Sequence, residues 1–249
     1  GDDRWIATLD YYDFDFKNPI ITENHQQLMD AYAAGGASKA AVQSQIYGGT
    51  SLQNDGSFAA SSVGRITANY VNGPATTVNG VDLYIKFEDD YANGVIAAGL
   101  EANYVAKYSV DAYMKGAVQV AANYECSGFF NINNPCRPMP EIKGKFFLNY
   151  TEDQHNFYGA INYISSYDDR RSTKAGCSET LVGGVCTEIA AHTTVDATYT
   201  YSWDDQFDLS FSVYNLTDEL PPFTVWEMNY DAYTHSPLGR FFKAGFTYR

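Results

Sequence analysis

Hydrophobic and polar residues alternate over long stretches of this chain, and a period of two is typical of a β-strand with two different faces. In residues 81–87 every second residue is apolar, and Asp, Tyr and Lys occupy the positions between. The same alternation returns in residues 195–203, 208–213 and 241–248. One face of the expected sheet is therefore apolar, and the opposite face carries Thr, Ser, Asp and Lys.

The alternation predicts eight strands, joined by connections of alternating length. The expected strands cover residues 4–16, 65–88, 94–113, 139–151, 154–168, 192–203, 206–216 and 238–249. The expected long connections cover residues 17–64, 114–138, 169–191 and 217–237. Short turns at one end and long loops at the other are typical of an antiparallel transmembrane β-barrel, in which the long loops are extracellular.

The first long connection has a different period. Leu28, Met29 and Tyr32 lie at helical spacing within residues 23–45, and a glycine pair at 35–36 interrupts the pattern. This predicts two short helices, which we expect to fold back over the rim of the barrel.

Composition narrows the possible functions. The 249 residues carry a net charge of −14, which argues against a nucleic-acid partner because such partners are bound through Lys and Arg. Aromatic residues make up 16% of the chain, and no apolar run reaches the length of a transmembrane helix. Tyr and Trp are favoured at the lipid headgroups, so the aromatic excess fits a barrel better than a soluble sandwich.

Two segments carry sharper motifs. Near the C-terminus, residues 215–218 read Asn-Leu-Thr-Asp, with Pro221 shortly after, and Gly239-Arg240 comes before the last strand. A second motif begins at Asn72-Gly73 and ends in a Gly-Val-Asp-Leu run within one long strand. Its members are Gly80, Val81, Asp82 and Leu83. In order and spacing, both segments resemble the TonB-dependent outer-membrane transporters.

The resemblance implies a multi-pass protein of the bacterial outer membrane that imports a scarce nutrient: a siderophore, cobalamin, a saccharide or a peptide. It implies a barrel of about 22 strands around an N-terminal plug. Residues 1–249 would be about eight C-terminal strands of that barrel. The implied partners are outer-membrane lipids, the rest of the barrel, the plug, and the TonB–ExbB–ExbD complex acting through the plug. No cofactor is implied.

One departure from the family concerns the ends of the chain. The family usually finishes on an aromatic residue, whereas this chain stops at Arg249, and Gly1 is not a natural start. We therefore expect a piece of a longer protein, without its plug and its earlier strands. The alternative is a self-contained eight-stranded barrel that acts as an adhesin or anchor, because strand edges left unpaired in lipid are costly and must close.

The four cysteines form two local pairs. Nine residues separate Cys126 from Cys136, and eight separate Cys177 from Cys186. Both pairs fall in expected extracellular loops, and short disulfides of this kind form in oxidising compartments such as the periplasm. A metal site is the rival interpretation, but no CxxC spacing or neighbouring His supports it.

Aromatic residues in the loops are candidates for ligand binding. Phe129, Phe130, Trp226, Tyr230 and Tyr233 could stack on a sugar ring or an iron-chelating catechol, or they could anchor one loop to another. In the strands, four basic residues are expected to face the lumen. These are Lys86, Lys107, Lys243 and Arg249.

Catalysis and metal binding find little support. His235 and Ser236 are adjacent, with Asp231 four residues earlier, and neighbours in a loop rarely reach the geometry of a catalytic triad. We therefore expect no enzyme activity. The acidic doublets at 89–90, 168–169 and 204–205 lack the pattern of a calcium loop, and turn capping by Asp explains them more simply.

Overall fold

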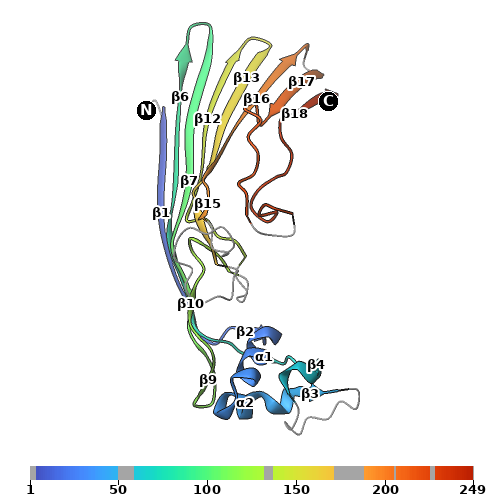
Figure 1. The fold of residues 1–249 in the computed structure, drawn as a ribbon. Coiled ribbons are helices and arrows are strands. Elements are labelled where there is room, and N and C mark those ends of the chain that lie inside the picture. Colours follow the sequence, from blue (N-terminus) through green and yellow to red (C-terminus); the bar gives the residue numbers. More distant parts are fainter. Residues whose placement is uncertain are drawn as a thin grey trace.

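The computed structural model describes residues 4–49, 59–131, 137–170, 188–204, 206–224 and 228–248. Its main feature is an antiparallel sheet whose eight long strands follow one another in sequence order (Figure 1). These strands are β1 (Trp5–Phe16), β6 (Thr76–Tyr91), β7 (Gly94–Val110), β12 (Ile142–Glu152), β13 (His155–Ile164), β16 (His192–Ser202), β17 (Phe207–Tyr214) and β18 (Phe241–Tyr248). All eight expected strands are confirmed, and the short turns lie together at the end of the sheet opposite the long loops.

The register of the sheet assembles the apolar residues of different strands into continuous rows. One row runs across five strands without a polar residue, and its members are Ile85, Leu100, Phe146, Ile161 and Val195. Phe146, Leu100 and Ile161 are all more than a third exposed. An exposed apolar row of this kind is the lipid-facing surface of a transmembrane barrel.

Aromatic residues mark both ends of this apolar surface. Toward the long loops, Tyr11 pairs with Val81 and Val81 with Tyr104, and both tyrosines are exposed. At the end with the short turns, Trp5, Trp203 and Tyr248 are about two-thirds exposed. Two aromatic belts are the arrangement expected at the two membrane surfaces.

The opposite face of the sheet is polar, as the alternation predicts. One row consists of Tyr84, Glu101, Lys145, Asn162 and Thr194. Lys86 and Lys243 share this face, as expected. Lys107 does not, because the register shifts by one residue beside Asn79 and Gly80, and the β-bulge reverses the alternation beyond it. Arg249 lies outside the described residues.

The sheet is open in the part of the chain that the structure describes. β1 and β18 form its two edges, and each pairs with one neighbour only. Among the described residues the eight strands therefore form an open arc, and not the closed eight-stranded barrel that the self-contained alternative requires.

Several expected strands end earlier than the alternation suggests, because their outer parts pair within the loops. The segment expected to begin at residue 65 starts at Thr76. Before it, β4 (Val63–Ile66) pairs with β3 (Ile46–Gly48), and β5 (Tyr70–Asn72) pairs with β2 (Ile20–Thr22). Alternation shows that a segment is extended, but it does not show which segment is its partner.

A small helical unit forms beyond the sheet, at the far end of the long loops (Figure 1). It contains α1 (His25–Ala34) and α2 (Gly36–Val42), and Gly35, with φ of 78°, separates them. The unit also includes two short 3-10 turns and a hairpin, namely η1 (Gln43–Gln45), η2 (Ala60–Ser62), β8 (Tyr113–Lys115) and β9 (Val118–Ala121). The two helices are confirmed, but they extend outward instead of folding back over the rim.

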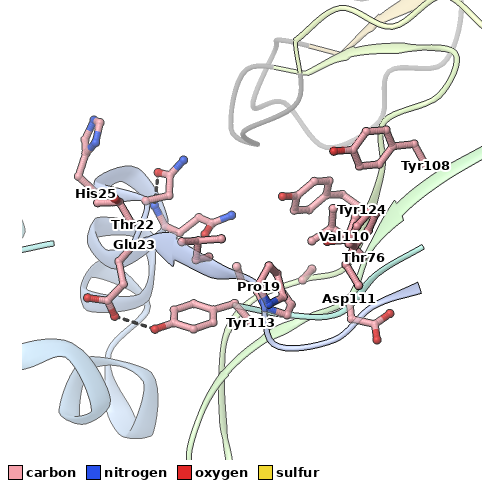
Figure 2. A pocket seen from close by; sticks show the side chains of 17 residues that line it. Pro19, Thr22, Glu23, His25, Thr76, Tyr108, Val110, Asp111, Tyr113 and Tyr124 are labelled. Atoms are coloured by element: carbon pink, nitrogen blue, oxygen red, sulfur yellow. Dashed lines mark hydrogen bonds between the residues drawn. The ribbon is translucent and has the colours of Figure 1, made fainter. Parts of the chain in front are cut away.

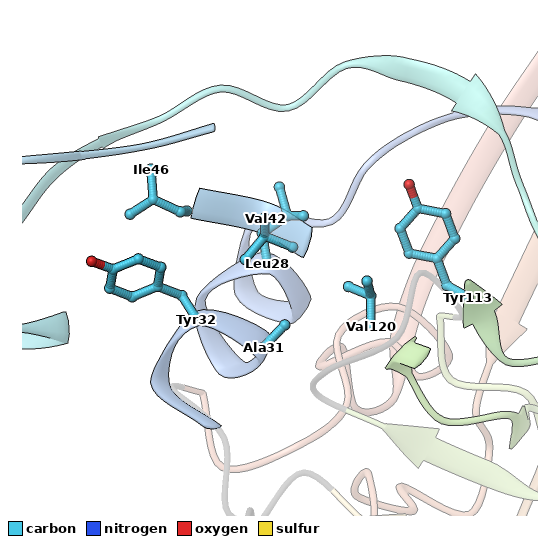
Figure 3. Packing of buried hydrophobic residues seen from close by; sticks show 7 residues of the cluster. All are labelled: Leu28, Ala31, Tyr32, Val42, Ile46, Tyr113 and Val120. Carbon is cyan, nitrogen blue, oxygen red and sulfur yellow. The ribbon is translucent and has the colours of Figure 1, made fainter. Parts of the chain in front are cut away.

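The helical unit has a hydrophobic core of its own (Figure 3). Leu28, Val42 and Ile46 are fully buried, and Tyr32 is almost so. Tyr113 and Val120 of the β8–β9 hairpin complete the cluster, so the first and second long loops pack as one body. Asn24 caps α1 by accepting hydrogen bonds from the backbone N–H groups of residues 26 and 27.

A second small sheet lies closer to the barrel wall. β11 (Phe129–Asn131) pairs with β14 (Tyr167–Arg170), which pairs with β15 (Glu188–Ile189), while β10 (Tyr124–Glu125) pairs with β7. Phe130, Tyr167 and Ile189 form its buried core. No helix among the described residues is long and apolar enough to cross a membrane.

Candidate functional site

A cavity of about 440 Å³ lies where the loop-side ends of β1, β6 and β7 meet the helical unit (Figure 2). One row of the sheet forms part of its wall, because Phe16 pairs with Thr76, Thr76 with Val110, and Val110 with Tyr124. Tyr108 belongs to the next row, beyond Val78. By register, these residues share the face of Asp82 and Glu101, so the cavity opens on the lumen side of the arc.

Aromatic residues continue from the cavity along the polar face of β1, toward the end of the sheet with the short turns. Phe16 stacks on Phe14, and Phe14 on Tyr12, each with ring centroids 5.9 Å apart. Phe14 and Phe16 are each about half exposed. The aromatic residues at alternate positions of segment 12–16 were the signal in the sequence, and they share this face because β1 pairs with β6 without a register shift.

Buried Glu23 fixes the geometry of the cavity on the side of the helical unit. Its carboxylate accepts hydrogen bonds from Tyr113 Oη at 2.7 Å, from the Asn69 N–H at 3.0 Å and from Gln45 Nε2. Lys115 Nζ lies 2.8 Å away as its ion-pair partner. Burial raises the pKa of Glu23, but these hydrogen bonds outweigh burial, so its pKa lies below the ordinary value. Glu23 therefore stays ionised and joins the first loop to the second.

Other polar groups at the cavity have no partner in the part of the chain that the structure describes. The hydroxyls of Tyr108 and Tyr124 and the side chains of His25 and Gln27 make no hydrogen bond to any described residue. Burial raises the pKa of Tyr124, so its hydroxyl remains protonated. The cavity thus combines aromatic faces with unused donors and acceptors, which is the composition of a small-molecule site.

A second, shallower hollow of about 420 Å³ lies on the polar face nearer the middle of the strands. It carries both signs of charge, since Asp82 and Glu101 line it together with Lys143 and Lys145. The two hollows therefore differ in charge, because the outer one has no lysine or arginine among its described lining residues.

The last long loop is held at its tip by a buried polar cluster. Tyr167 donates to Asp231 Oδ2 at 2.5 Å, and His235 Nε2 lies 3.1 Å from the same hydroxyl. Thr224 donates to Asp169, and all of these residues are at least nine-tenths buried. Because the hydroxyl proton of Tyr167 goes to Asp231, His235 must donate from Nε2, which leaves its Nδ1 unprotonated. The cluster joins the last loop to β14.

Two buried histidine nitrogens in this cluster have no hydrogen-bond partner among the described residues. They are His235 Nδ1 and His192 Nε2, and the two rings meet edge to face with centroids 5.0 Å apart. Burial lowers the pKa of His235 to about 4; His192 and Lys143 add to this effect, and Asp231 opposes it. His235 is therefore neutral at neutral pH.

This geometry does not form a catalytic triad. His235 faces Tyr167 and Asp231, while the hydroxyl of Ser236 accepts a hydrogen bond from the backbone of Leu238. No group of three or more metal-binding side chains occurs among the described residues. The Asp204 carboxylate caps its turn by accepting hydrogen bonds from the backbone N–H groups of Gln206 and Phe207, at 2.8 and 2.9 Å.

The C-terminal motif residues come together at the base of the last loop. Asn215, with φ of 53°, accepts from the Glu219 N–H at 2.9 Å and donates to the Glu219 carbonyl at 2.8 Å. Asp218 accepts from the Arg240 N–H at 2.7 Å, and Arg240 donates to the Leu216 carbonyl at 3.4 Å. A Cβ on Gly239 would lie 2.5 Å from the Asp218 carboxylate. The motif therefore holds the two ends of the loop together.

The second motif lies at the β-bulge. A Cβ on Gly80 would lie 2.2 Å from the Tyr104 carbonyl and 2.3 Å from the Tyr12 hydroxyl, so only glycine fits beneath the Tyr12 ring. Val81 and Leu83 lie on the apolar face, and Asp82 accepts from Asn103 at 2.6 Å on the polar face.

The aromatic candidates from the sequence have different environments. Phe130 is buried and meets Tyr233 edge to face at 6.4 Å, and Arg137 lies over the Tyr233 ring at 5.3 Å. This contact favours loop anchoring over ligand binding for the pair. Phe129 lies in β11, Tyr230 bridges to Phe223, and Trp226 lies outside the described residues.

Cys126 is fully buried and is disulfide-bonded. The other three cysteines, Cys136, Cys177 and Cys186, lie outside the described residues, so the expected pairing stays a prediction.

Comparison with solved structures identifies the same architecture. The siderophore receptor PirA from Acinetobacter baumannii superposes with a TM-score of 0.58 at 17% identity, over 100% of this chain and 30% of that one. The ferric enterobactin receptor PfeA from Pseudomonas aeruginosa, as its G324V mutant, gives 0.57 at 15% identity, over 100% and 29%. At these identities the likeness concerns the fold alone. The chain thus spans less than a third of the receptors it matches.

Sequence comparison defines the family. No curated protein matches the chain at a significant level. The family model described as TonB dependent receptor-like, beta-barrel matches residues 1–216, which is most of the chain. Together with the open arc of antiparallel strands, this shows that the chain belongs to the TonB-dependent receptor β-barrel family.

Proposed function

We propose that these residues are the C-terminal part of an outer-membrane receptor that binds a scarce small nutrient outside the cell and imports it. The energy would come from TonB–ExbB–ExbD acting through a plug domain elsewhere in the protein. The observation that carries the proposal is the eight-stranded arc, which has a lipid-facing apolar surface, a polar lumen face and the family match. The two receptors named above support nutrient import, since their names describe a siderophore receptor and a ferric enterobactin receptor.

The structure supports a division of labour within this arc. The strands supply the wall, and the first two loops, joined through Glu23, supply an extracellular cavity that opens on the lumen side. A nutrient bound in that cavity would lie at the extracellular end of the lumen, next to the row of aromatic residues on β1. No residue described above is placed for bond-making chemistry, so the role we propose is binding and passage.

Growth competition tests the proposal. Cells with a deletion of the receptor gene would compete with the parent strain under iron limitation, cobalamin dependence, and growth on single saccharides or peptides. We expect a growth defect for one nutrient class, and an equal defect for that class in a tonB deletion strain. Equal growth under all these conditions, or uptake that persists without TonB, would contradict active import by this protein.

A further inference from the structure

The outer cavity has a charge that restricts its ligand. Glu23 and Asp111 are its ionisable carboxylates, and no lysine or arginine is among its described lining residues. The charge of Glu23 is balanced by Lys115, but Asp111 is exposed and its side chain makes no hydrogen bond to any described residue. An anionic ligand would meet uncompensated negative charge here and would find no lysine or arginine among the described lining residues to pair with.

The uncharged groups of the cavity point to a definite chemistry. Tyr108 and Tyr124 lie close together on one side of the cavity, and the helical unit with His25 lies on the other (Figure 2). The tyrosine rings offer flat surfaces, and their hydroxyls, which have no hydrogen-bond partner among the described residues, can both donate and accept. Gln27 adds an amide, and the carboxylate of Asp111 accepts only. A ligand with a flat apolar face and a rim of hydroxyl groups would satisfy these groups without burying a charge.

We propose that this cavity binds an uncharged polyhydroxylated ring molecule, that is, a neutral saccharide, and not an anionic ferric chelate. The inference rests on the proposed receptor function and specifies the ligand class of its outer site. It separates this chain from the receptors it resembles in fold, which at 14–17% identity need not share its ligand. The volume of about 440 Å³ falls in the range of small-molecule pockets, roughly 300–1,000 Å³, and suits a short saccharide.

Direct binding to the purified full-length receptor in detergent tests the ligand class. A glycan array of neutral mono- and oligosaccharides and a titration with ferric enterobactin supply the two probes. We expect at least one neutral saccharide to bind, and its dissociation constant to rise about tenfold or more in Tyr124→Ala, because the ring surface is lost. Tyr124→Phe keeps the ring and should have a smaller effect.

The control variant is Tyr70→Ala, which removes an exposed tyrosine that is outside the cavity lining and should leave binding unchanged. Asp111→Lys should not create affinity for ferric enterobactin in a site with no other lysine or arginine among its described lining residues. Circular dichroism and heat-modifiable gel mobility would confirm that each variant is folded.

Two results would overturn the proposal. One is the absence of binding to every neutral saccharide on the array. The other is ferric enterobactin binding that weakens in Tyr124→Ala. Because binding is measured without uptake, failure here would leave the growth phenotype of the proposed import function unaffected.

Discussion

At the scale of single residues, His235 makes the last loop sensitive to pH. Its pKa falls to about 4 in the folded protein, against an ordinary value near 6.5. The unfolded chain therefore binds the proton more readily, so stability is fully present above about pH 6.5 and decreases as the pH falls toward 4. The loss is on the order of a few kcal/mol.

Hydrogen exchange of residues 228–240 between pH 7 and pH 4, corrected for intrinsic rates, would measure this effect. We expect protection to decrease through this window in the wild type. His235→Phe cannot titrate and should give a flat profile. The same slope in both proteins would show that another group is responsible.

Glu23 connects the two loops of the helical unit. Glu23→Ala would leave Lys115 partly buried without its ion-pair partner, and would leave the Tyr113 hydroxyl and the Asn69 N–H without an acceptor. Breaking a buried ion pair in this way costs about 3–5 kcal/mol. We expect local opening of the helical unit, detected as faster hydrogen exchange in α1 and β9.

The sheet strands provide the comparison for this variant. Protection of β12 and β13 should not change, because these strands pair with each other in the sheet and contribute no residue to the core of the helical unit. Loss of protection throughout the chain would mean that Glu23 stabilises the whole fold and not the helical unit alone.

At the scale of elements, the last loop is held at two points. Its base is fixed by Asn215, Asp218 and Arg240, and its tip by Asp231 and His235 against β14. A loop that is fixed at its tip as well as at its base loses less entropy when it is ordered than a loop fixed at its base alone. This explains how more than twenty residues form a defined loop with little regular structure.

Gly239→Ala tests the base of the loop. The new methyl group would lie within 2.5 Å of the Asp218 carboxylate and would displace it from the Arg240 N–H. We expect a loss of about 1–3 kcal/mol, seen as unfolding at lower denaturant concentration. Ser236→Ala lies in the same loop, is exposed, and should have little effect. Equal stability of Gly239→Ala and the wild type would show that the base contact is not needed.

At the scale of the whole molecule, an added charge should be harmful on one face of the arc and tolerated on the other. Phe146→Arg places a cation within the apolar row that faces lipid, and such a change costs roughly 2–4 kcal/mol near the middle of the bilayer. Asn162→Arg places the same side chain on the polar face, where Asp196 accepts a hydrogen bond from Asn162. We expect impaired assembly in lipid for the first variant only.

Heat-modifiable gel mobility of the full-length protein, refolded into vesicles, would measure the difference. Similar loss of the folded band in both variants would contradict the assignment of the two faces.

Much of this architecture was predictable because alternation is a local property of the sequence. A strand with one face in lipid and one in a lumen must alternate, so the eight strands and the order of short and long connections follow from the sequence. The helices of the first loop follow from the spacing of Leu28 and Tyr32 and from Gly35, whose positive φ ends the first helix.

Tertiary structure alone decided the rest, because those features depend on pairs of residues far apart in the chain. The bulge beside Gly80 places Lys107 on the opposite face. The strands β4 and β5 pair with other strands of the first loop. The cavity joins Tyr124 to Phe16 through a register across four strands. Periodicity fixes the conformation of each strand, whereas the site depends on which strands meet and in which register.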